Sequence, residues 1–111
     1  MVVAMTVGIA RLVLFVAGSH SLKGKRMVLR KLQDRTREKF GVALAEVGEN
    51  DVWQRAQLGL AVVGKERVAT AAFLDDVLRF LEGQADVTHV EKELQTFGTG
   101  SVGAAFKHWE G

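Results

Sequence analysis

The stretch VALAEVGENDVWQRAQLGLAVV, residues 42–63, contains two runs of strand-forming residues separated by a short polar turn. The first run covers residues 42–47, the turn covers residues 48–51, and the second run covers residues 52–63. Within the second run, every even-numbered position from Ala56 onward is apolar, which is the period of a strand with one buried face. The stretch therefore predicts two consecutive strands in the middle of the chain.

A helix is expected on each side of this pair of strands. Before the pair, Ser21 is suited to cap a helix that runs to about Phe40, and Gly41 is suited to end it. The apolar stripe expected on the buried face of that helix is Leu22, Leu29, Leu32, Thr36 and Phe40. After the pair, apolar residues recur at helical spacing from about Glu66 to Leu81, which predicts a second helix.

Strands are expected at both ends of the folded part, over residues 3–16 and residues 86–97. The resulting order predicts an α+β domain of the ferredoxin-like βαββαβ class, a four-stranded antiparallel sheet with both helices on one face. Right-handed crossovers give this sheet the strand order 4-1-3-2. We expect a single domain over residues 1–97, followed by a glycine-rich tail over residues 98–111.

The composition narrows the class of protein. At 111 residues, with 48% hydrophobic and 25% charged residues, the chain is typical of one packed domain. The absence of cysteine excludes thiol catalysis and Cys-ligated metals, and it removes the disulfides that are typical of small secreted domains. Arg11 interrupts the first apolar run well before the length of a membrane span. We therefore expect a cytoplasmic protein without membrane contact.

Two glycine-rich stretches imitate nucleotide-binding motifs. Residues 98–103 match G-x-G-x-x-G, but too few residues follow for the helix and the parallel strand that bind a dinucleotide. Residues 59–65 begin like a P-loop, but Glu66 stands where a Ser or Thr must hold magnesium. We expect no cofactor.

The residues that could support catalysis or metal binding are scattered. His20, His89 and His108 fall in a loop, a strand and the tail, without the spacing that metal sites use. Ser19 and Ser21 flank His20, but no third group that would orient the imidazole can be named. We therefore expect neither a metal site nor an enzyme.

Positive charge is concentrated in the first helix. Residues 21–40 hold eight basic residues against two acidic ones, whereas the whole chain has a net charge of only +2. The basic residues are Lys23, Lys25, Arg26, Arg30, Lys31, Arg35, Arg37 and Lys39. Such an asymmetry favours an anion-facing surface. The alternative is that these residues are only the solvated side of an amphipathic helix.

A candidate nucleic-acid site follows from the expected topology. The end of the first strand, the start of the first helix and the start of the third strand should meet at one edge of the sheet. Basic residues there could follow a phosphate backbone, the serines could bind one phosphate, and the tryptophan could stack on a base. The predicted site consists of Ser19, Ser21, Lys23, Arg26, Arg30, Arg37, Trp53, Gln54 and Arg55. RNA or a ribosomal particle is the expected partner.

The expected sheet also has a face without helices, and that face is unusually apolar. Its predicted interaction residues are Val7, Ile9, Val13, Phe15 and Val63. An apolar patch of this size on a water-soluble domain is usually covered. Either a second copy in a homodimer or another protein packs there, or Phe106 and Trp109 of the tail fold back over it.

Two motifs resemble those of a known family. Residues 19–26, SHSLKGKR, resemble its S-x-S-L-K-E-K-R signature. Residues 45–63 resemble the A-E-V-G…D…W-Q-R-A…L-G…A-V-V signature of the same family, the YlxP-like bacterial proteins. The resemblance covers about residues 5–97 and implies a ferredoxin-like fold, but no reaction, substrate or cofactor. Genes of this family often lie beside those of translation initiation and ribosome maturation factors, which implies a role around RNA.

This chain departs from the family pattern in its first helix. Family members commonly have Glu at the position of Gly24, where it would complete a capping box with Ser21. Gly24 cannot do so, and a glycine in the first turn weakens a helix by up to about 1 kcal/mol. We therefore expect the start of the basic helix to fray.

Overall fold

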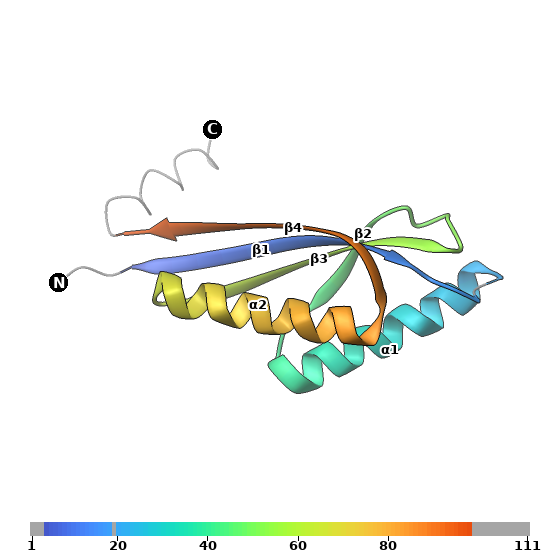
Figure 1. Cartoon of the computed structure of the whole chain (residues 1–111), viewed down its shortest axis with the longest axis horizontal. Helices are drawn as coiled ribbons and strands as arrows, with labels where there is room; N and C mark the ends of the chain where they lie inside the picture. Colours follow the sequence, from blue (N-terminus) through green and yellow to red (C-terminus); the bar gives the residue numbers. More distant parts are fainter. Residues whose placement is uncertain (1–3, 19, 99–111) are drawn as a thin grey trace.

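The computed structural model of the chain describes residues 4–18 and 20–98. Its elements follow one another as β1 (Met5–Phe15), α1 (Leu22–Phe40), β2 (Leu44–Gly48), β3 (Arg55–Gly64), α2 (Arg67–Gln84) and β4 (Asp86–Phe97). This is the predicted order of strands and helices. Both helices lie on the same side of the sheet (Figure 1), and neither α1 nor α2 is long and apolar enough to cross a membrane.

The strands form one antiparallel sheet in the order β2-β3-β1-β4. Read from the opposite edge, this is the order 4-1-3-2 that the crossover rule predicts. β1 is central, so that Ala10 lies opposite Leu60 of β3 on one side and opposite Lys92 of β4 on the other. The pairing of β1 with β4 is interrupted by a register shift between Val13 and Leu14.

The core lies between the sheet and the helices. Alternation along β1 and β3 buries one side chain in two, and the helices contribute apolar residues at helical spacing. The buried apolar residues include Leu12, Leu14, Leu58, Leu60, Leu29, Leu32, Leu74, Val77, Leu78 and Leu81. Thr36 is buried as predicted, and its hydroxyl donates a hydrogen bond to the backbone carbonyl of Leu32. Leu22 and Phe40, which were predicted to be buried, are partly exposed at the two ends of α1.

The ends of α1 are capped as predicted. The backbone N–H of Gly24 donates to the Ser21 hydroxyl over 3.0 Å, and Gly41 ends the helix in the left-handed conformation with φ of 69°. The helix begins at Leu22, directly after its cap, so its first turn is formed in this structure.

The predicted bounds of the other elements need correction. β2 begins at Leu44 rather than at residue 42, and β3 begins at Arg55 rather than at residue 52. α2 extends to Gln84, beyond the predicted end at Leu81. The hairpin between β2 and β3 is wider than expected because residues 49–54 form a loop, whose contacts are described below.

Candidate nucleic-acid interface

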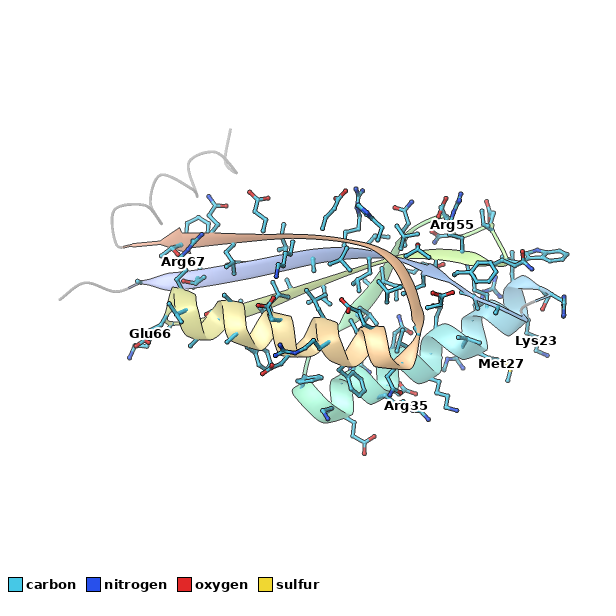
Figure 2. All side chains as sticks on the ribbon, in the orientation of Figure 1. Lys23, Met27, Arg35, Arg55, Glu66 and Arg67 are labelled. Atoms are coloured by element: carbon cyan, nitrogen blue, oxygen red, sulfur yellow. The ribbon has the colours of Figure 1, made fainter. Side chains whose placement is uncertain are left out.

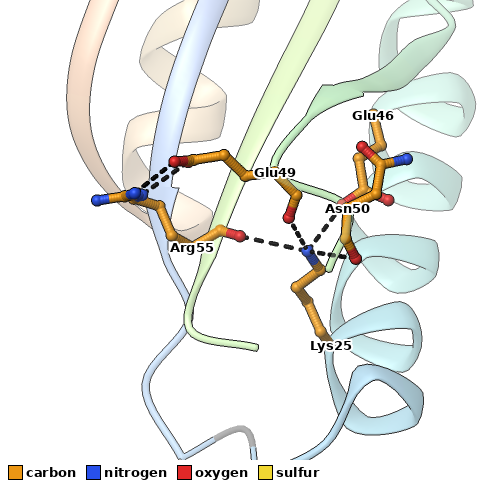
Figure 3. A network of polar contacts seen from close by, with 5 residues as sticks. All are labelled: Lys25, Glu46, Glu49, Asn50 and Arg55. Atoms are coloured by element: carbon orange, nitrogen blue, oxygen red, sulfur yellow. Dashed lines mark hydrogen bonds and ion pairs between the residues drawn. The ribbon is translucent and has the colours of Figure 1, made fainter. Parts of the chain in front are cut away.

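Lys25, one of the eight basic residues of α1, is buried, because its side chain is only 1% exposed. Its Nζ atom donates hydrogen bonds to the backbone carbonyls of Glu49 (2.8 Å) and Arg55 (3.2 Å), with a longer contact to that of Asn50 (3.4 Å). It also forms an ion pair with the Glu46 carboxylate at 2.9 Å. Figure 3 shows this network, which ties the start of α1 to the loop between β2 and β3.

The inward orientation of Lys25 follows from its place on the helix. Lys25, Leu29, Leu32 and Thr36 recur at spacings of four, three and four residues, which places them on one side of α1. A buried ammonium group needs a hydrogen-bond acceptor for each of its three N–H bonds, and the loop supplies them. The expectation that all eight basic residues of α1 face solvent is therefore wrong for Lys25.

The basic residues of the predicted site on α1 are exposed to solvent. Lys23, Arg26, Arg30 and Arg37 are all exposed. Within residues 4–18 and 20–98, none of them forms an ion pair with a carboxylate. They fall within about 60° of arc on the helix, so they form one positively charged stripe. We call this set the α1 cation stripe.

The predicted residues at the start of β3 do lie near the end of β1 and the start of α1. The backbone N–H of Val16 donates to the Gln54 carbonyl over 2.8 Å, and Lys25 contacts the carbonyl of Arg55. Trp53 and Gln54 are exposed beside this junction. Ser21 acts as the helix cap, and Ser19 lies outside the described residues.

Arg55 differs from the residues of the α1 cation stripe because its charge is compensated. Its Nε atom donates to the Glu49 carboxylate over 2.7 Å, and a second guanidinium nitrogen pairs with the other carboxylate oxygen (Figure 3). The hydrogen bond from Arg55 lowers the pKa of Glu49, and the same bond raises the pKa of Arg55. Arg55 is therefore less suited to bind phosphate than the sequence suggested.

Replacing Glu49 by glutamine should make the fold less sensitive to acid. The pKa of Glu49 is lower in the folded protein than its ordinary value of 4.5. Its ionised carboxylate therefore stabilises the fold above that ordinary value, and this contribution is lost as the pH falls through the folded pKa. Urea unfolding between about pH 6 and about pH 2 should show a larger loss of stability in the wild type than in Glu49→Gln.

The matched control for this prediction is Glu38→Gln on α1. Within the described part of the chain, Glu38 forms no ion pair with a basic residue. The stability of Glu38→Gln should depend on pH in the same way as the stability of the wild type does. Equal acid sensitivity of the wild type and Glu49→Gln would contradict the role of the Glu49–Arg55 pair.

The predicted interaction face is divided by charge. Ile9, Phe15 and Val63 are exposed on it, and Val7 and Val13 are partly exposed. Between its two apolar ends, Arg11 forms an ion pair with Glu91 at 2.7 Å, and His89 contacts the same carboxylate at 3.1 Å. The hydrogen bonds with His89 and with Arg11 lower the pKa of Glu91. The face therefore consists of two smaller apolar patches, and Phe106 and Trp109, which were proposed to cover it, lie outside the described residues.

The histidines do not form a metal centre in the part of the chain that is described. His20 is exposed in the loop before α1, His89 contacts Glu91, and His108 lies outside the described residues. Across residues 4–18 and 20–98, no three histidine or carboxylate side chains come close enough together to hold a metal ion.

Comparison with known proteins places the chain in a family. Residues 7–94 match a family described as "Protein of unknown function (DUF503)". The chain is 36% identical over 91 residues to the uncharacterised protein YlxP of Bacillus subtilis (strain 168), an alignment that covers 82% of this chain and 99% of that protein.

Similar solved structures are more distant in sequence. The de novo designed protein Foldit4 aligns with a TM-score of 0.46 and 13% identity, over 83% of this chain and 94% of that one. The structural-genomics protein YJCS aligns with a TM-score of 0.47 and 11% identity, over 78% and 96%. The family match and the similarity to YlxP agree with the two sequence motifs, and the chain therefore belongs to the YlxP-like DUF503 family of proteins of unknown function.

Proposed function

We propose that this chain is a non-catalytic binding protein with a ferredoxin-like domain that attaches to RNA, free or in a ribosomal particle, through α1. The observation that carries the proposal is the α1 cation stripe, whose members are exposed and have no carboxylate partner among the described residues. A purely structural helix surface would be expected to pair some of these charges with the acidic residues nearby. Lys25 meanwhile holds the helix in place from the buried side.

The stripe has the dimensions of a phosphate-binding surface. From Lys23 to Arg37 it extends about 21 Å along the helix axis, enough to meet several phosphates of one strand. Arginine binds phosphate through two parallel hydrogen bonds, and three of the four residues are arginines. Figure 2 labels Lys23 and Met27, two exposed residues near the start of α1.

Reversing two charges of the stripe should greatly weaken RNA binding. In the double variant Arg26→Glu and Arg30→Glu, the affinity for a labelled RNA strand should fall by roughly tenfold or more at low salt, because two phosphate contacts become repulsive. Fluorescence anisotropy measures the affinity, and circular dichroism shows whether the fold is kept.

The matched control reverses two exposed cations at the start of α2, in the double variant Lys65→Glu and Arg67→Glu. It changes the net charge by the same amount but leaves α1 intact. Its affinity should stay close to that of the wild type. An equal loss in both double variants, or no loss in the α1 variant, would contradict binding through the stripe.

Docking of a second copy or of another protein on the open sheet face is the alternative function. The Arg11–Glu91 ion pair counts against it, because charges in the middle of an interface must lose their hydration. The RNA proposal needs no such desolvation, since its cations meet phosphate at the surface.

A further inference from the structure

The open face of the sheet carries an apolar patch at the end where β1 begins. Strand pairing makes its members neighbours, because Val63 lies opposite Val7 and Ala61 lies opposite Ile9. Val63 and Ile9 are 66% and 48% exposed. A contiguous apolar patch favours an interaction site, whereas single exposed apolar residues do not. We call it the β1-start patch, and its residues are Met5, Val7, Ile9, Ala61, Val63 and Phe97.

The β1-start patch is too small for a stable dimer. Toward the middle of the face it ends at the Arg11–Glu91 ion pair, which a larger partner would have to desolvate. A stable protein–protein interface uses about 20–30 residues from each partner, far more than the patch contains. The patch therefore fits a short segment of chain better than it fits a second copy of the domain.

The chain brings such a segment to the patch. β4 ends at Phe97, which lies opposite Met5, so residue 98 follows at the border of the patch (Figure 1). From Gly98, four residues of chain span at most about 14 Å, which brings Val102 within reach of the patch. To cover the open face the chain must reverse its direction here, and Gly98 and Gly100 permit the backbone conformations of such a turn.

The sequence that follows these glycines has an apolar stripe. Four apolar residues recur at the spacing i, i+3, i+4 and i+7, which is typical of an amphipathic helix. They are Val102, Ala105, Phe106 and Trp109. A helix over residues 102–109 rises about 11 Å, and the part of β1 in the patch advances about 13 Å. A helix this short is not stable alone in water, so it needs an apolar surface to pack on.

We infer that residues 102–109 of this chain form a short helix that packs its apolar stripe on the β1-start patch. Phe106 and Trp109 supply most of the apolar area that the contact buries. The cover keeps the domain from associating through this face. The inference goes beyond the proposed function and does not rest on it, because α1 lies on the other side of the sheet (Figure 1).

The test follows the fluorescence of Trp109 in the full chain. The chain has two tryptophans, so Trp53→Phe leaves Trp109 as the only one. In the folded protein, Trp109 should emit at shorter wavelength than in urea, and acrylamide should quench it several-fold less, because the packed indole is removed from water. Adding Val63→Lys places a charge in the patch and should move both values toward those in urea. Ile9→Lys should have the same effect.

The matched control is Phe15→Lys, because Phe15 is exposed on the same face beyond the ion pair. It should leave the fluorescence of Trp109 unchanged, and circular dichroism shows whether each variant keeps the fold. Emission of Trp109 equal to that in urea would overturn the inference. So would shielding that both Val63→Lys and Ile9→Lys leave unchanged. Shielding that is lost on dilution would also overturn it, because a second copy would then supply the contact.

Discussion

Replacing Lys25 by methionine should lower the free energy of unfolding by about 3 kcal/mol. The substitution removes the donor to the carbonyls in the loop between β2 and β3, and it leaves the Glu46 carboxylate without its ion pair. One Glu46 oxygen is buried, and no other polar partner for it is present in the described part of the chain. The Glu46 side chain is still 21% exposed, so we expect the lower end of the range for breaking a buried pair.

Urea unfolding measures this effect, and two further variants interpret it. Lys23→Met removes the same charge from the exposed side of α1 and should change stability by less than about 0.5 kcal/mol. In the double variant Lys25→Met and Glu46→Leu, part of the loss should be recovered, because no uncompensated carboxylate remains. Equal, small losses in Lys25→Met and Lys23→Met would show that the buried network does not stabilise the fold.

The sheet and the helices could be predicted from the sequence because their patterns have a fixed period. In β3, the alternation of Ala56, Leu58, Leu60 and Val62 predicts a buried face, and all four are buried. The start of this strand could not be placed in the same way. The backbone carbonyls of the loop before it are directed by Lys25, which lies at least 24 residues earlier in the chain, and local propensity carries no information about such a partner.

The candidate site was predictable to a smaller extent. The helical projection predicts that Arg26 and Arg30 are exposed, as they are. The same projection places Lys25 on the side of Leu29 and Leu32, which is the buried side. The pairing of Arg55 with Glu49 depends on the path of the loop, in which Glu49 itself has a positive φ of 58°.

The salt dependence of RNA affinity tests most directly whether the α1 cation stripe binds phosphates. Contacts from Lys23, Arg26, Arg30 and Arg37 predict that the logarithm of the association constant falls with the logarithm of salt concentration with a slope of about −3 for a single strand. Between about 50 and 200 mM salt, affinity should therefore fall roughly fiftyfold. The variant Arg30→Ala should have a slope shallower by about 0.7. A slope near zero in the wild type, or an unchanged slope in Arg30→Ala, would contradict binding of RNA through this helix.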